Sequence, residues 1–303
     1  MAALNFLIRI FQKIRNFDSN FPSSAKDYKT KASGVQDKRV ARQVGDWHVL
    51  CSSVESCEKR RTPVAAVWVI QHIHCETPGT IAEALDREGI SIQSVRVFAG
   101  EQIPKEMGAA AGLIVMGGPV GVYEQDRYPF LRDEIYLIEQ ALTEKKAILG
   151  VCLGSQLLAA VLGAKVAKGK QKEIGWYPVT LSRAAMVDPL WKGIESPFTA
   201  YHWHGDVFEL PRGAEALASS ALTPCQAFRY GKNAYGFLFH MEVTEKIIEE
   251  MVQTFADELQ EENVDGRQIV RRAGDYLPRL QSIGKLVFQR WASLVKTLFI
   301  SSS

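Results

Sequence analysis

The chain has little of what is typical of secreted, membrane-spanning or nucleic-acid-binding proteins. Its 303 residues include only five cysteines, an odd number at irregular spacing with no CxxC pair, so we expect neither a disulfide framework nor a zinc or redox motif. No apolar run is long enough to cross a bilayer. A formal net charge of +2 provides no general attraction to nucleic acid. These absences predict free thiols in a reducing compartment, and we expect a cytoplasmic protein.

Acidic residues are absent before Asp18. In this segment apolar residues recur at helical spacing with basic residues between them: Leu4, Leu7, Phe11, Ile14, Arg9, Lys13 and Arg15. The pattern leaves organelle targeting or peripheral membrane contact open, although a short accessory helix is the interpretation we favour. Residues 18–62 are polar and mixed in character, so we expect residues 1–62 to form a poorly ordered leader.

From Pro63 onward, apolar runs of strand length alternate with segments of helical spacing. Strands are expected over 64–70, 95–98, 112–116 and 147–151, and helices over 80–87 and 130–145. This alternation predicts an α/β fold with a mostly parallel sheet flanked by helices. Residues 172–181 are typical of an antiparallel excursion, and further strands are expected over 198–204 and 234–240. The chain then becomes helical from Val243, with a second helix over 283–298.

The most informative stretch, residues 148–156, reads Ile-Leu-Gly-Val-Cys-Leu-Gly-Ser-Gln. An apolar strand ends there in Cys152, flanked by Gly150 and Gly154, and a helix-like apolar run follows at once. This is the pattern of a nucleophile elbow, in which the neighbours are small because the turn is tight and strained. The N-terminus of the following helix favours the reactive thiolate. The alternative is that Cys152 is an inert, buried strand residue.

A nucleophilic cysteine needs a base, an orienting group and backbone donors for the oxyanion. His240 and Glu242 are two residues apart in an extended segment, so they point to the same side, where the carboxylate can hold Nδ1–H and leave Nε2 facing the thiol. Leu153 supplies the N–H that follows the nucleophile. The sequence Gly117-Gly118-Pro119 ends a neighbouring strand and is well placed for the second donor, although it is also typical of an ordinary turn.

Three motifs follow one another along the chain: Gly-Gly-Pro, Gly-x-Cys-x-Gly-x-Gln and Phe-His-x-Glu-Val-Thr. In this order they resemble the class I, triad-type glutamine amidotransferase domain, over roughly residues 64–256. In detail the segments 202–206 and 172–176 are similar to those of GMP synthase and its stand-alone relatives. The resemblance implies the flavodoxin-like class I glutaminase fold, with an amidotransferase domain over 63–256 and a C-terminal helical extension over 257–303.

The resemblance also implies a role for each site residue. Cys152 would attack the carboxamide of glutamine, with His240 as general base and acid and Glu242 orienting it. Gly118 and Leu153 would donate to the oxyanion. Substrate contacts are implied for four further residues, namely Gln156, His204, Gly205 and Asp206, of which the last could equally have a local structural role.

Neither a metal nor another cofactor is expected. Two His-x-His pairs, 72/74 and 202/204, could share a face of a strand and bind zinc. No carboxylate at a sensible sequence spacing joins them, however, and the resembling family uses no metal for glutamine hydrolysis. The chain departs from many family members at Leu238 and Met241, where glutamine and proline are common, which suggests an unusual pocket or partner surface.

The leading hypothesis is therefore a stand-alone glutaminase that releases ammonia. The chain lacks a P-loop and a Ser-Gly-Gly-x-Asp-Ser loop, so an ammonia-accepting synthetase would be a separate partner. Two alternatives remain: a hydrolase of γ-glutamyl peptides with the same triad, and a non-catalytic module that binds glutamine. The C-terminal helix carries an apolar stripe expected to pack on the domain, with partner docking or membrane-surface contact as alternatives: Ile283, Leu286, Val287, Trp291, Leu294 and Leu298.

Overall fold

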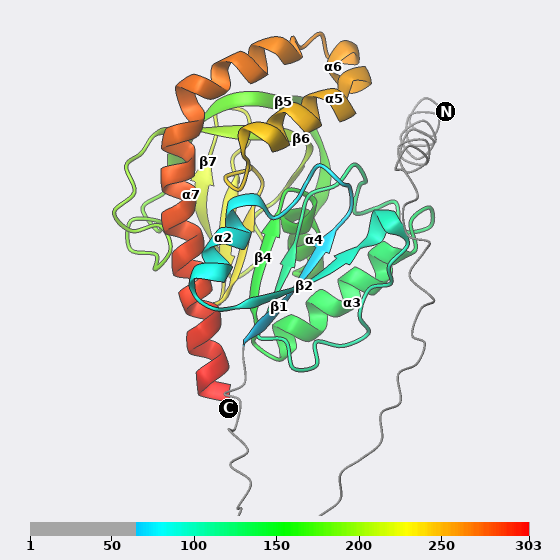
Figure 1. The fold of residues 1–303 in the computed structure, drawn as a ribbon, viewed down its shortest axis with the longest axis vertical. Coiled ribbons are helices and arrows are strands. Elements are labelled where there is room, and N and C mark those ends of the chain that lie inside the picture. The colour runs from blue at the N-terminus through cyan, green and yellow to red at the C-terminus, as the bar shows by residue number, and fades with distance from the viewer. Residues whose placement is uncertain (1–64, 303) are drawn as a thin grey trace, which may run out of the picture. The chain divides into compact units, whose positions relative to one another are not determined.

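The computed structural model describes residues 65–302, so the leader predicted over 1–62 lies outside the described residues. In this part of the chain nine strands form one sheet, in the order β2-β1-β3-β4-β9-β8-β7-β5-β6, with helices on both faces (Figure 1). The left half of this order is parallel and the right half is antiparallel.

The parallel half has the flavodoxin-type strand order. Its strands are β2 (Ser91–Arg96), β1 (Ala66–Gln71), β3 (Gly112–Val115), β4 (Ala147–Val151) and β9 (Ala234–Phe237). Every residue of β3 and β4 is buried, which explains why these strands are apolar throughout. The predicted strand over 95–98 is displaced. Strand β2 ends at Arg96 and a 3-10 turn, Val97–Ala99, follows, because this largely exposed edge strand carries few apolar residues.

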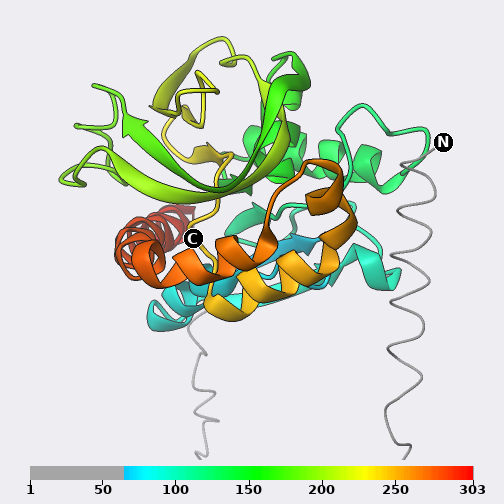
Figure 2. The same cartoon turned by 90° about the horizontal axis from the view of Figure 1, so that it is seen from above.

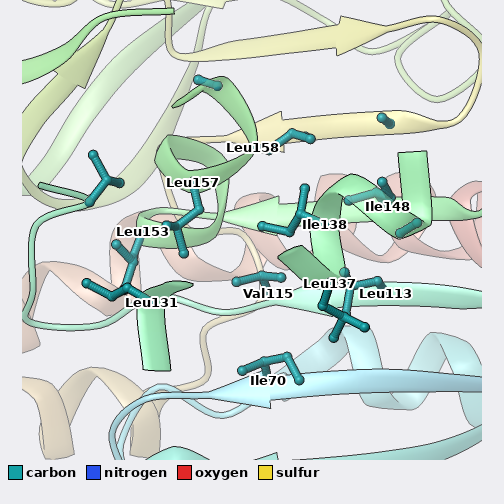
Figure 3. Packing of buried hydrophobic residues seen from close by; sticks show 14 of the residues in the cluster. Ile70, Leu113, Val115, Leu131, Leu137, Ile138, Ile148, Leu153, Leu157 and Leu158 are labelled. Carbon is teal, nitrogen blue, oxygen red and sulfur yellow. The ribbon is translucent and has the colours of Figure 1, made fainter. Parts of the chain in front are cut away.

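Helices cover the two faces of this half in separate groups (Figure 2). Helices α3 (Phe130–Thr143) and α4 (Leu153–Val161) contact each other and strands β3 and β4. The second group consists of α2 (Gly79–Arg87), α5 (Glu245–Thr254) and α7 (Gly266–Ser302), and α7 contacts both of the others. Figure 3 shows the core beneath α3 and α4, where Leu137, Ile138 and Leu157 pack against Leu113 and Ile148 of the sheet.

The antiparallel half is larger than the sequence indicates. Strands β5 (Val166–Leu181) and β6 (Phe198–Phe208) form a long ribbon that extends both predicted segments. Two short strands, β7 (Ala214–Ser219) and β8 (Ala227–Tyr230), connect the ribbon to β9 and were not predicted. Strand β7 reads Ala-Glu-Ala-Leu-Ala-Ser, which has neither β-branched nor aromatic residues and so gives no strand signal.

The C-terminal helices pack on the rest of the domain. Helix α7 begins at Gly266, well before the predicted start, because a charged stretch and Pro278 obscure its first turns in the sequence. Ile283, Val287 and Trp291 of the predicted stripe are buried, whereas Leu286 is 38% exposed. The expectation that the stripe packs on the domain is therefore confirmed for its central residues. No described helix, the 37-residue α7 included, is both long enough and apolar enough to cross a bilayer.

Replacing Trp291 tests this packing. The Trp291 side chain is fully buried, so Trp291→Ala should lower the free energy of unfolding by about 3–5 kcal/mol. The exposed Leu286 of the same helix is the matched control, and Leu286→Ala should change it by less than about 0.5 kcal/mol. Urea unfolding followed by circular dichroism measures both. Equal, small effects would show that α7 does not depend on this contact.

Candidate active site

Cys152 lies in a strained turn between β4 and α4. Its backbone has φ 49° and ψ −107°, a conformation that is rare for a residue with a side chain. The turn is possible because Gly154 faces the carbonyl oxygen of Val115, which a Cβ at that position would overlap. Gly150 likewise leaves no room for a Cβ against the backbone of Gly154. The N–H of Cys152 donates to the Phe237 oxygen of the neighbouring strand at 2.8 Å.

His240 lies on the segment that follows β9. Strand β9 ends at Phe237, so it is shorter than the strand expected over 234–240. His240 is held instead by an isolated bridge to β6, in which its N–H donates to the oxygen of Tyr201 at 2.8 Å. The side chain of His240 is paired through Nδ1 with Oε1 of Glu242 at 2.6 Å, and both residues are buried. The i, i+2 spacing therefore brings the two side chains together as predicted. Nε2 of His240 has no hydrogen-bond partner among the described residues, and the ring is near enough to the Cys152 thiol for each to shift the pKa of the other.

Burial controls the protonation of this pair. Burial raises the pKa of the Cys152 thiol, and the neighbouring imidazole of His240 and the N–H of Leu153 offset this only in part. Burial therefore opposes the thiolate that the N-terminus of the following helix is expected to favour. Burial alone would lower the pKa of His240, but the carboxylate of Glu242 and the thiol together raise it well above its ordinary value. Glu242 thus prepares the imidazole to accept the thiol proton.

The predicted oxyanion residues lie beside the nucleophile. The Cβ of Cys152 is 3.3 Å from the position that a Cβ on Gly117 would take. A Cβ on Gly118 would lie 3.2 Å from the Leu153 side chain and 2.6 Å from Cβ of His72. The Gly117-Gly118 segment is therefore packed between the elbow and the loop that follows β1.

Three of the four predicted substrate residues lie together. The side-chain amide of Gln156 donates to the backbone oxygen of Asp206 at 3.2 Å. The carboxylate of Asp206 interacts with the hydroxyl of Tyr123, whose pKa rises to about 12 through burial and through this carboxylate. Gly205 is next in sequence and lies against the side chain of Lys172. Sequence reasoning missed Tyr123, which comes from the loop after β3.

The fourth predicted substrate residue, His204, belongs to a buried polar cluster. Its Nε2 lies 3.4 Å from Nδ1 of His202 and 3.4 Å from Oε2 of Glu173. Burial lowers the pKa of His204 to about 3 and that of His202 well below its ordinary value, so both rings are neutral. Glu173, 29 residues upstream on the adjacent strand, is the carboxylate that sequence spacing could not connect to this pair.

This cluster has the residue types of a metal site, and the three groups lie close enough together to share one ion. However, Oε2 of Glu173 already accepts hydrogen bonds from the Thr223 hydroxyl at 2.6 Å and from the Gln226 amide at 2.8 Å. These donors account for the buried carboxylate as part of a hydrogen-bond network. The other His-x-His pair is divided, because His72 is buried and His74 is exposed.

Glu76 is a further site residue that sequence reasoning missed. It is buried in the loop after β1, where its Oε2 has no hydrogen-bond partner and occupies the space that a side chain on Gly117 would need. Burial raises the pKa of Glu76 to about 7, opposed by the nearby His240 and reinforced by Glu242. Its position at the carboxyl end of β1, where ligand sites of open parallel sheets lie, was the available signal.

Helix α6 (Ala256–Glu261), from the C-terminal part of the chain, contacts the site through Glu258. Glu258 accepts from the indole N–H of Trp203 at 2.9 Å and from Nζ of Lys172 at 2.8 Å. The backbone oxygen of Trp203 in turn accepts from the Cys152 thiol at 3.6 Å. Trp203 is therefore buried, and it connects helix α6 to the nucleophile through these two hydrogen bonds. Cys152 is only 7% exposed beneath this cover.

A cysteine on a strained strand-to-helix turn, beside a buried His–Glu pair and a Gly-Gly loop, defines a cysteine-dependent amide hydrolase of the α/β class. Comparison with known families agrees, because residues 76–259 match the family model for class I glutamine amidotransferases. The chain belongs to the class I glutamine amidotransferase family.

Individual relatives are similar over most of the domain. The chain is 36% identical over 212 residues to the glutamine amidotransferase-like protein YfeJ of Salmonella typhimurium, covering 69% of this chain and 88% of that protein. A crystal structure of a Thermotoga maritima glutamine amidotransferase superimposes with a TM-score of 0.69 at 32% identity, covering 75% of this chain and 98% of that one. The chain is also 32% identical over 149 residues to the GMP synthase of Porphyromonas gingivalis. That alignment covers 48% of this chain and only 28% of that enzyme.

The raised pKa of Cys152 predicts its reactivity. Because less thiolate is present at neutral pH, alkylation of Cys152 by iodoacetamide should be slow at pH 7 and should accelerate up to pH 9 and beyond. His240→Ala should move this profile to still higher pH, because the imidazole lowers the thiol pKa. Peptide mass spectrometry follows Cys152, with the buried Cys225 as an internal control. Rapid labelling that is constant from pH 5 to 8 would instead indicate a thiolate–imidazolium pair.

The absence of a required metal also remains a prediction. Because Oε2 of Glu173 is already held by Thr223 and Gln226, the purified protein should hold far less than one zinc per chain, and chelators should leave its turnover unchanged. Elemental analysis after dialysis measures the first and an activity assay with EDTA the second. One tightly held ion per chain, lost in Glu173→Gln, would contradict this expectation.

Proposed function

We propose that the protein hydrolyses the side-chain amide of L-glutamine through a thioester on Cys152. The sulfur attacks the amide carbon while His240 Nε2 takes the thiol proton, and the oxyanion receives hydrogen bonds from Gly118 and Leu153. Collapse breaks the carbon–nitrogen bond, and the proton on His240 leaves with ammonia. Water, deprotonated by His240, then attacks the γ-glutamyl thioester, which releases glutamate and restores the thiol.

One observation carries this proposal. The His240–Glu242 pair, joined at 2.6 Å, is buried and interacts with a cysteine in an elbow conformation. Glu242 accepts from Nδ1, so it holds the ring with Nε2 free for the thiol and stabilises the imidazolium that forms on attack. An inert cysteine would need neither the strained backbone nor a buried base.

Glutamine fits this site better than a γ-glutamyl peptide does. Cys152 is almost entirely buried, and its thiol lies against the backbone oxygen of Trp203, which favours a leaving group as small as ammonia. The Gln156–Asp206 pair supplies an amide and a carboxylate at the rim, groups suited to the α-carboxylate and α-ammonium of a free amino acid. The γ-glutamyl peptide hydrolase remains the second candidate because it needs the same triad.

The ammonia acceptor would be a separate protein. The GMP synthases that resemble this chain are named as glutamine-hydrolysing enzymes, and the chain spans about a quarter of their length. By analogy, we propose that an ammonia-using synthetase acts as partner. The Leu238 and Met241 positions, both buried beside His240, are where this site differs from dedicated synthetase glutaminases.

Ammonia release tests the function. Purified protein should release ammonia from L-glutamine, and Cys152→Ala should abolish this release. Glu242→Gln should lower kcat by about a hundredfold or more, because it removes the carboxylate that orients and charges the base. Glu83→Gln, exposed on α2, is the matched control and should behave like the wild type.

The same assay separates the alternatives when glutathione and a γ-glutamyl dipeptide are included. Cleavage of these peptides but not of glutamine would assign the protein as a γ-glutamyl hydrolase. Glutamine binding by calorimetry without ammonia release or glutamate formation would assign it as a binding module.

A further inference from the structure

His72 forms a buried bridge between the Gly-Gly loop and helix α3. It directly follows β1, its Nδ1 lies 2.9 Å from the carbonyl oxygen of Gly117, and its Nε2 lies 2.8 Å from Oε1 of Glu134. The side chains of His72 and Glu134 are only 1% and 0% exposed. Phe130, one turn before Glu134 on α3, packs against the imidazole with ring centroids 5.9 Å apart. Nothing in the proposed reaction scheme uses this pair.

The partners of His72 determine where its hydrogens lie. A carbonyl oxygen only accepts, so Nδ1 must carry a hydrogen and donate it to Gly117. One further proton is shared between Nε2 and the Glu134 carboxylate, and Nδ1–H is retained whichever atom holds it. Although burial lowers the pKa of His72, Glu134 and the Gly117 carbonyl raise it overall, in agreement with this arrangement. Nδ1 of His72 therefore donates to the Gly117 carbonyl in either case.

This hydrogen bond also orients the next N–H. A trans peptide is planar, with its C=O and N–H pointing in opposite directions. The Gly117 oxygen faces His72, so the Gly118 N–H of the same peptide faces away from it. The loop contacts His72 as well as Cys152 and Leu153. Within residues 65–302 no protein acceptor takes the Gly118 N–H.

The loop needs such a support because two glycines form it. A Gly-Gly peptide can rotate so that the carbonyl and the N–H exchange places, since neither residue has a Cβ to oppose the movement. Pro119 restricts Gly118 but leaves the rotation about Gly117 free. Side chains cannot replace the glycines, because His72 and Glu76 occupy the space around them. A rotated peptide would direct an oxygen, rather than a hydrogen, at the developing oxyanion.

We infer that His72 is a positioning residue: held by Glu134, it pins the Gly117 carbonyl and so keeps the Gly118 N–H directed at the oxyanion. This inference rests on the proposed glutamine hydrolysis. If His72 acts in this way, the oxyanion hole is already formed in the isolated chain. The protein then needs no partner to reach its catalytic conformation.

Two substitutions separate positioning from packing. The amide nitrogen of asparagine takes the place of Nδ1, so His72→Asn keeps the donor to Gly117 and loses the bond to Glu134. Glutamine extends its amide to the place of Nε2, so His72→Gln keeps the bond to Glu134 and loses the donor to Gly117. The matched control, His74→Gln, alters the exposed histidine of the same loop.

Steady-state ammonia release from glutamine gives the first readout. His72→Gln should lower kcat by about tenfold to a hundredfold with little change in KM, since an oxyanion donor acts mainly in the transition state. His72→Asn should stay within about threefold of wild type, because the donor to Gly117 remains. Equal losses in both variants would indicate a packing role, and no loss in His72→Gln would show that the loop is held by other contacts. Either result would overturn the inference.

A second readout does not depend on turnover. In nitrogen-15 spectra of histidine-labelled protein, Nδ1 of His72 should show the shift of a protonated nitrogen throughout pH 6–9, and an unprotonated Nδ1 would contradict the inference. Wild-type protein that is active alone supports both proposals. If glutamine hydrolysis appears only after a partner is added, the proposed function stands and the preformed hole is wrong. If no γ-glutamyl substrate is cleaved while Nδ1 is protonated, the proposed function fails and the role of His72 in holding the loop stands.

Discussion

The contact between Gly154 and the carbonyl of Val115 is the constraint on which the active site depends. It lets the first turn of α4 press against the end of β3, and this closeness forces the backbone of Cys152 into its strained conformation. The same closeness brings the loop after β3, with Gly117 and Gly118, beside the nucleophile. The strained turn at Cys152 thus places the thiol next to the Gly117-Gly118 loop. The buried strands β3 and β4 are closely packed and so keep the turn in this conformation.

Burial makes the electrostatics of this site depend on pairing. Three buried histidines each contact a buried carboxylate: His240 with Glu242, His72 with Glu134 and His204 with Glu173. The pairs differ in consequence. The first raises the pKa of the base that faces the thiol, the second orients a backbone loop, and the third belongs to a neutral hydrogen-bonded wall. Because charge is costly to bury alone, each histidine acts through the partner that the fold provides.

Local patterns predicted the elements that are regular and buried. Strands β1, β3 and β4 are continuous apolar runs, and helix α3 has clear 3.6-residue spacing, so each was located from residues close in sequence. The elbow and the His240–Glu242 pair were found for the same reason, since both depend on spacings of four residues or fewer. Strands β7 and β8 were not predicted because they are short and are formed by pairing with other strands rather than by a local sequence pattern. The start of α7 escaped because tertiary packing tolerates Pro278 within a long helix.

The sequence by itself determined the α/β class and the family, and it located the cysteine elbow and the His240–Glu242 pair, because each of these is written in a short, ordered motif. Only the tertiary structure decided that burial raises the pKa of the Cys152 thiol, and that Glu76, Glu134 and Glu173 join the site. Glu134 lies 62 residues from His72 and Glu173 lies 31 residues from His204. No local spacing encodes such contacts. They arise because α3 packs beside the loop after β1, and because β5 and β6 pair in antiparallel register with Glu173 opposite His204.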